Sequence, residues 1–156
     1  MTKRLALTGI LLFATIAIAT TSNYPSLDLE KGSLEWRLFE LKNKLLYRAI
    51  RSVESTDGRD TVNEREQAYG DVQIRQVAID QLNQCYNTKT FTLAKAFSDE
   101  WSYLYFTLTM AAYNPEMNFE KGARIWNGGV FGHLQSCTIP YWRKVSARLE
   151  KLRYAK

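Results

Sequence analysis

The sequence predicts a mainly α fold with a small irregular or β lobe, which is an α+β domain dominated by helices. After residue 33, apolar residues recur every three to four positions in several segments, which is the period of amphipathic helices. Residues 57–70 are polar and lack this period, as expected for a loop or a short β-hairpin. The 156 residues are 46% hydrophobic and 24% charged, which predicts one compact domain and excludes a disordered chain or a multi-span membrane protein.

The first 19 residues are predicted to be a secretory signal peptide. Lys3 and Arg4 precede an uncharged apolar run over residues 5–19. The run ends in Ala17-Ile18-Ala19, a pattern of small residues that is typical of a cleavage site. We therefore expect the folded part of the chain to be secreted or periplasmic.

A membrane anchor over residues 5–27 is the alternative, because this segment carries no charge. Its apolar run is shorter than the roughly 18 to 20 residues that span a bilayer comfortably. We therefore expect no stable membrane insertion after processing, although transient anchoring stays open. Residues 20–32 are predicted to be a polar linker, and residues 33–156 the folded domain, which we expect to be a monomer.

The first predicted helix begins at Ser33 and ends before Gly58. Its expected inward-facing stripe comprises Leu34, Leu38, Leu41, Leu45, Ala49 and Val53, widened by Phe39, Leu46 and Ile50. Glu54 lies in the last turn, at the edge of this stripe and facing the polar segment. Burial there favours the neutral carboxyl and raises its pKa, which is what a general acid requires.

Four further helices are predicted, over residues 72–86, 92–112, 119–126 and 138–152. Thr92 is expected to cap the second of these, and Asn114-Pro115 to stop it. The turn Asn127-Gly128-Gly129 ends the third helix. The last helix is expected to point four residues inward: Tyr141, Val145, Leu149 and Leu152.

The two cysteines, Cys85 and Cys137, are predicted to form one structural disulfide, as is common in exported proteins. It would tie the helix after Gln73 to the start of the last helix; two buried thiols are the alternative. Neither cysteine forms a metal-ligand pattern with His133, the single histidine, so we expect no metal site.

The net charge of +5 includes Lys3 and Arg4, and removal of these two leaves +3. The remaining cations are scattered and accompany no nucleic-acid motif, so we expect no nucleic-acid partner. A mildly positive surface fits approach to an anionic polymer such as a bacterial cell wall.

Four short segments stand out in order along the chain: Glu54-Ser55, Gly70-Asp71-Val72-Gln73-Ile74, Ile125-Trp126-Asn127-Gly128-Gly129, and Thr138 to Val145 with Tyr141 inside it. They resemble the motif series of the lytic transglycosylase and goose-type lysozyme-like superfamily. The resemblance spans about residues 45 to 146. It implies that residues 33–156 form a lysozyme-like catalytic domain that needs no cofactor. The implied partner is the peptidoglycan glycan strand, cut at the β-1,4 bond between N-acetylmuramic acid and N-acetylglucosamine.

The same resemblance implies a role for each matched residue. Glu54 would be the sole catalytic acid/base. The implied substrate-binding residues are Ser55, Gln73, Trp126, Asn127 and Tyr141. Among them, Gln73 and Asn127 would hydrogen-bond the glycan, and Tyr141 would hold Glu54 in place. The chain departs from the family pattern at Trp126, where the motif has tyrosine, and at Asp71-Val72, where it has leucine and methionine. The second departure is expected to put a charge near the groove.

Three questions stay open at the level of sequence. A lytic transglycosylase needs only Glu54, whereas a hydrolytic muramidase by the two-carboxylate route needs a partner. Four nearby carboxylates qualify, and spacing selects none of them: Asp57, Asp60, Glu64 and Glu66. A catalytically inactive glycan-binding module is a further alternative. The sequence is also compatible with either a bacterial or a viral source.

Overall fold

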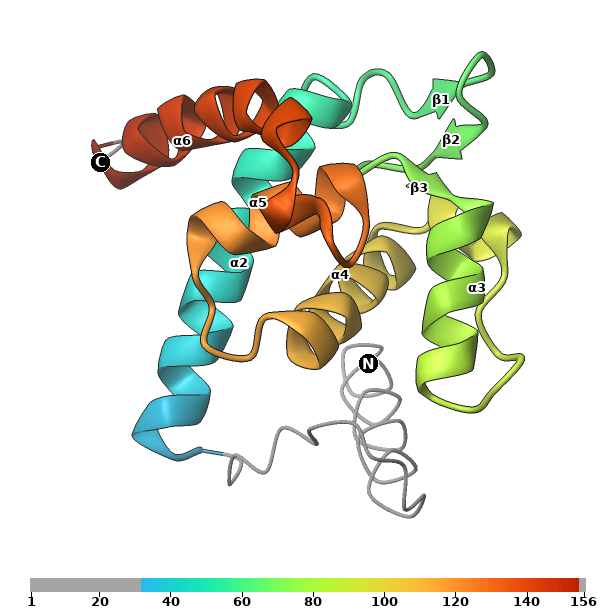
Figure 1. Cartoon of the computed structure of the whole chain (residues 1–156), viewed down its shortest axis with the longest axis horizontal. Helices are drawn as coiled ribbons and strands as arrows, with labels where there is room; N and C mark the ends of the chain where they lie inside the picture. The colour runs from blue at the N-terminus through green and yellow to red at the C-terminus, as the bar shows by residue number, and fades with distance from the viewer. Residues whose placement is uncertain (1–31, 155–156) are drawn as a thin grey trace, which may run out of the picture.

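The computed structural model describes residues 32–154, and in this part five α-helices pack together with a small three-stranded sheet at one edge (Figure 1). The helices are α2 (Leu34–Glu54), α3 (Gln76–Cys85), α4 (Asp99–Tyr113), α5 (Phe119–Gly128) and α6 (Ile139–Tyr154). The strands are β1 (Val62–Asn63), β2 (Ala68–Tyr69) and β3 (Ile74–Arg75). The predicted mainly α, α+β class is therefore confirmed.

The signal peptide, the alternative anchor and nearly all of the linker lie outside the described residues. Within residues 32–154, no helix is both long enough and apolar enough to cross a membrane.

Helix α2 begins where the sequence predicts, because the Ser33 hydroxyl accepts a hydrogen bond from the Trp36 backbone N–H at 3.1 Å. Its buried face differs from the predicted stripe, since Leu34, Leu38 and Leu41 are 76%, 51% and 66% exposed. The face that packs inward consists of Phe39, Asn43, Leu46, Tyr47, Ala49 and Ile50. Helices α4, α5 and α6 all contact α2, and α6 lies at the end of α2 that leads into the sheet (Figure 1). Leu38 and Leu41 therefore lie on the opposite face of α2 from Phe39 and Asn43, which are buried in the same turns.

The polar segment after α2 forms a β-hairpin from β1 and β2, and β2 also pairs with a third strand, β3. Strands β1 and β2 pair antiparallel with Val62 opposite Tyr69, and β2 pairs antiparallel with β3 with Tyr69 opposite Ile74. The predicted helix over 72–86 therefore starts late, at Gln76. The reason is local: Gly70 and Gln73 have φ of +78° and +54°, which no right-handed helix contains.

The other helices differ from prediction mainly at their starts. Ser98, not Thr92, caps α4, and a 3₁₀ helix over Leu93–Phe97 precedes it. Helix α5 starts at Phe119 as predicted, with Asn118 accepting from the Lys121 backbone N–H at 2.9 Å. On α6, Val145 and Leu149 are buried as expected, whereas Tyr141 is half-buried.

The predicted disulfide is wrong for this structure, because both cysteines are free and they are not close. Cys85 is buried at the end of α3, while Cys137 is exposed in a 3₁₀ turn over Ser136–Thr138. Cys85 lies on α3, which packs on α4, whereas the turn that contains Cys137 packs on α5 and α6.

Candidate active site

Glu54 and Tyr141 come together although 87 residues separate them in the sequence. The Tyr141 hydroxyl donates to Glu54 Oε1 at 2.7 Å. Glu54 is in the last turn of α2 and Tyr141 in the first turn of α6, and these two helices pack against each other. The packing of α6 on α2 therefore creates the pair that the resemblance implied.

The pKa of Glu54 is raised above its usual value, chiefly because burial penalises the carboxylate. The Tyr141 hydroxyl and the cations Arg75 and Lys144 oppose this by stabilising the charged form, and Glu66 adds to the rise. Burial and the adjacent Glu54 also raise the pKa of Tyr141 well above its usual value. The phenol thus stays protonated and donates to Oε1, which leaves Oε2 of Glu54 to carry a proton.

Of the four candidate second carboxylates, Glu66 is the one that raises the pKa of Glu54. Glu66 forms an ion pair with Arg75 of β3, so its carboxylate is already engaged by a guanidinium. Asp57, Asp60 and Glu64 are exposed, and Asp60 Oδ2 accepts from the Thr56 hydroxyl at 2.9 Å. The charges of the sheet region that act on Glu54 are therefore those of the Glu66–Arg75 ion pair, in which the carboxylate already has a partner.

Gln73 lies in a left-handed backbone conformation between Gly70 and β3. Its side-chain Nε2 donates to the backbone oxygens of Asp60 and Gly70, each at 3.1 Å. The carboxamide oxygen makes no hydrogen bond to any residue in the described range 32–154. Gln73 is half-buried, so this oxygen is held in a fixed orientation with its acceptor capacity unused.

Trp126 differs from the predicted substrate contact because its polar atom is used within the protein. The indole Nε1 donates to the Val72 backbone oxygen at 2.9 Å, and the ring packs 5.1 Å from that of Phe106. Trp126 therefore ties α5 to the residue before Gln73. The neighbouring Asn127 is exposed in the last turn of α5, and its side chain makes no hydrogen bond to another described residue.

Ser55 requires a correction, since the structure buries it completely. Its hydroxyl donates to the Arg51 backbone oxygen at 3.1 Å and accepts from the Gly58 backbone N–H at 2.9 Å. A side chain with no exposed surface cannot touch a glycan. Ser55 instead closes the C-terminus of α2 directly after Glu54.

Asp71 also requires a correction, because its charge does not face the groove. Its side chain is 6% exposed, and Oδ2 lies 2.7 Å from Nε of Arg51 in α2. Burial raises the pKa of Asp71, Arg51 opposes this, and a neighbouring carboxylate, Asp99 at the start of α4, raises it further. The sequence contained a signal for this pair, since Arg51 stands one helical turn before Glu54 and Asp71 is the residue that departs from the family pattern.

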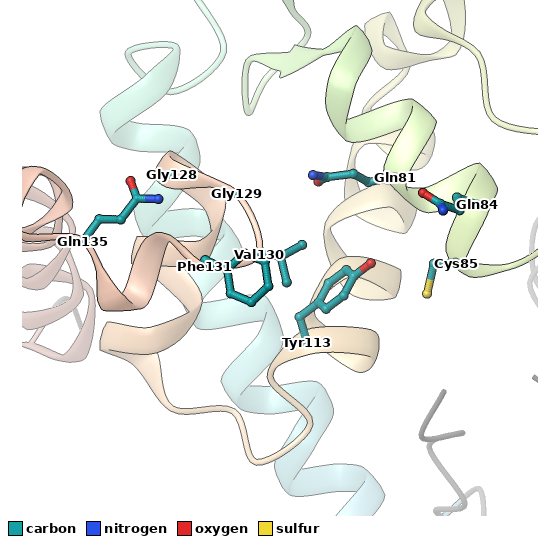
Figure 2. A pocket seen from close by; sticks show the side chains of 9 residues that line it. All are labelled: Gln81, Gln84, Cys85, Tyr113, Gly128, Gly129, Val130, Phe131 and Gln135. Atoms are coloured by element: carbon teal, nitrogen blue, oxygen red, sulfur yellow. The ribbon is translucent and has the colours of Figure 1, made fainter. Parts of the chain in front are cut away.

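A cavity of about 360 Å³ adjoins the end of α5, next to Asn127 (Figure 2). It is lined by Gln81, Gln84, Cys85, Tyr113, Gly128, Gly129, Val130, Phe131 and Gln135. In Figure 2 the Gln81 side chain points from α3 toward the loop that contains Gly129. The lining combines carboxamides and aromatic rings without a charged side chain. The lining does not include Glu54 or Tyr141, so the cavity is not the site of the acid/base pair.

Within residues 32–154, no group of histidine, cysteine and acidic side chains is arranged to hold a metal ion. No family model matches this chain, and no curated protein or solved structure matches it either.

Proposed function

We propose that this chain is an exported peptidoglycan glycosidase of lysozyme-like type that acts as a lytic transglycosylase. The observation that carries the proposal is the Tyr141–Glu54 pair: a half-buried carboxyl with a raised pKa, oriented by a phenol at 2.7 Å. A raised pKa keeps such a carboxyl protonated to higher pH than a carboxyl in water, and a protonated carboxyl can donate its proton to a glycosidic oxygen. The motif order from Glu54 to Tyr141 supports the same assignment.

In the proposed reaction, Glu54 protonates the oxygen that leaves as the C1–O4 bond breaks. The acetamido oxygen of the N-acetylmuramic acid attacks C1 and forms a cyclic oxazolinium ion, so no protein nucleophile is needed. Glu54, now a carboxylate, takes the proton of the sugar's own 6-hydroxyl as that oxygen displaces the acetamido oxygen. The product ends in a 1,6-anhydro sugar, and no water is consumed.

The ion pair between Glu66 and Arg75 favours this route over hydrolysis. An inverting hydrolase needs a second carboxylate that is free to activate water. The Glu66 carboxylate is engaged by the Arg75 guanidinium, so it is less available to bind and orient a water molecule. The hydrolytic muramidase remains the second candidate, since Glu66 is the carboxylate whose charge reaches Glu54.

The experiment is digestion of purified peptidoglycan followed by mass spectrometry of the released fragments. We expect products one water lighter than hydrolysis products. Glu54→Gln keeps the size and most hydrogen bonds of the side chain but removes the titratable proton, so activity should fall by at least about 10²- to 10⁴-fold. Glu66→Gln is the matched variant. Under the transglycosylase proposal it retains activity within a few fold.

Each alternative predicts a different result. Reducing ends together with loss of activity in Glu66→Gln would identify a hydrolase. Glycan binding without product, unchanged in Glu54→Gln, would identify an inactive binding module. The proposed partner is the glycan strand, and the proposed setting is secreted or periplasmic; the chain is proposed to act as a monomer.

A further inference from the structure

The ion pair between Arg51 and Asp71 joins the two segments that carry the candidate chemistry; Asp71 is buried, whereas the Arg51 side chain is 36% exposed. Arg51 is in the last turn of α2, three residues before Glu54. Asp71 lies in the turn that ends at Gln73, and its Oδ2 is 2.7 Å from Arg51 Nε. Removing a carboxylate from water costs free energy that only a close partner offsets, so the two side chains hold each other in one geometry.

Asp71 is linked to Gln73 through hydrogen bonds within the same turn. The Gly70 backbone oxygen accepts from both the backbone N–H and the side-chain Nε2 of Gln73, each at 3.1 Å. Gln73 itself has a φ of +54°, a conformation that persists only where its surroundings impose it. A displacement of Asp71 would therefore displace the Gln73 carboxamide.

Arg51 is linked through hydrogen bonds to the turn that follows Glu54. The Arg51 backbone oxygen accepts from the Ser55 backbone N–H and from its hydroxyl, both at 3.1 Å. Gly58 closes over the ion pair: a Cβ there would lie 2.5 Å from Arg51 Nη2 and 3.2 Å from Asp71 Oδ1. The turn after Glu54 is therefore packed directly against both charged side chains.

We propose that Arg51 and Asp71 are positioning residues whose ion pair sets the Gln73 carboxamide relative to the Glu54 carboxyl. This inference rests on the proposed function, in which Glu54 transfers the proton and Gln73 binds the glycan. It also accounts for the aspartate at a position where the resembled motif has leucine. A small misplacement of groups around a reacting bond costs up to about 10²-fold in rate, so a rigid link of this kind has a measurable effect.

The test separates positioning from simple stabilisation through a double substitution. Asp71→Leu alone leaves the Arg51 guanidinium without its partner beside the introduced leucine. This variant should have a lower midpoint of thermal unfolding. Arg51→Met combined with Asp71→Leu removes both charges and, as with other buried pairs, should restore much of the stability. If the pair positions the site, the double variant still loses between about 10- and 100-fold in kcat. Arg51→Lys, which keeps a cation, should lose less than the double variant.

A second readout does not depend on activity. The side-chain amide protons of Gln73, followed by NMR hydrogen exchange, should lose protection in the double variant because the Asp60 and Gly70 oxygens no longer hold them. The matched control removes another ion pair with the same 2.7 Å separation, by Lys121→Met with Glu116→Leu, and should leave kcat and the Gln73 protons unchanged.

Failure of the positioning role and failure of the proposed function give different results. If wild type releases no fragments from peptidoglycan, the proposed function fails, and Gln73 exchange still decides whether the pair positions this side chain. If the double variant and Arg51→Lys both keep wild-type kcat and Gln73 protection, the positioning role is overturned. If the double variant fails to fold, Arg51→Lys alone decides by the same two readouts.

Discussion

Glu54 is held in an environment that opposes its ionisation, and this has a consequence for folding. Burial raises its pKa in the folded state above the value in the unfolded chain. The stability associated with the protonated form is complete below the unfolded pKa and is lost as pH rises through the folded pKa. Above its folded-state pKa, ionised Glu54 therefore destabilises the fold, and the same burial favours its proposed role as an acid.

We accordingly expect Glu54→Gln to be more stable than wild type at pH 7, because glutamine keeps the Tyr141 hydrogen bond without a charge. The difference should vanish below about pH 4, where both side chains are neutral. Each tenfold rise in the proton affinity of Glu54 corresponds to about 1.4 kcal/mol. Urea denaturation at a series of pH values measures the difference in free energy of unfolding between Glu54→Gln and wild type. Glu64→Gln, at an exposed carboxylate, is the control; an equal gain there, or a gain in Glu54→Gln that persists at pH 4, would contradict the linkage.

Tyr141 is expected to orient Glu54 and to stabilise its carboxylate form. Tyr141→Phe removes the donor at 2.7 Å, and hydrogen bonds to charged groups contribute about 1.5 to 3 kcal/mol. We expect kcat to fall by about 10- to 100-fold and the alkaline limb of the pH–rate profile to move to higher pH, since the hydrogen bond lowers the pKa of Glu54. Tyr154→Phe, at an exposed residue of the same helix, should change neither quantity. An unmoved alkaline limb in Tyr141→Phe would exclude the stabilising role.

The junction between β2 and β3 depends on one glycine for close backbone approach. Gly70 has a φ of +78°, and a Cβ there would lie 1.9 Å from the Ala96 backbone oxygen. Backbone cannot move aside as a flexible side chain can, so the strand junction and the 3₁₀ helix over Leu93–Phe97 would have to separate.

We therefore expect Gly70→Ala to lower the free energy of unfolding by at least about 2 kcal/mol and to weaken glycan binding through Gln73. Gly129→Ala is the matched control, because Gly129 has the same φ of +78° but nothing within 4 Å of its would-be Cβ. It should cost only the conformational strain, about 1 kcal/mol. Denaturation of the two variants measures the difference; equal losses would mean that steric overlap at Gly70 has no effect.

Element boundaries show how far local sequence rules extend in this chain. The start of α2 at Ser33 and the end of α4 at Asn114 follow from capping and stop residues, so the sequence predicted them. The start of α3 was wrong, because Gln73 adopts a left-handed conformation that residues outside the segment impose. The start of α4 was wrong because Ser98 competes with Thr92 as a cap, and packing of the 3₁₀ helix on α4 decides between them.

At the scale of the whole molecule, the arrangement of helices determines the state of the cysteines. Cys85 is buried on α3, and burial raises the pKa of its thiol, whereas Cys137 is exposed. We expect one iodoacetamide adduct on the native protein in the absence of reductant, at Cys137, and two after denaturation. Intact mass and peptide mapping measure both. No adduct in either state would restore the Cys85–Cys137 disulfide that the sequence predicted.

The sequence by itself determined the helical class, the place of Glu54 at the end of an amphipathic helix, and the four motif segments. These depend on the period of apolar residues and on local turn chemistry, which neighbouring residues fix. Its prediction of the buried face of α2 was wrong for Leu34, Leu38 and Leu41, and it misplaced the charge of Asp71. Both depend on which helices cover α2 and on where Arg51 points, and neither is a local property.

Only the tertiary structure decided which polar groups meet. The Tyr141–Glu54 contact spans 87 residues and the Trp126–Val72 contact spans 54, so no local rule can produce them. The ion pair of Glu66 with Arg75 and the burial of Ser55 were decided in the same way. The physical reason is that the pKa and the availability of a side chain depend on burial and on distant charges, and both are set only when α6, α5 and the sheet pack around the end of α2.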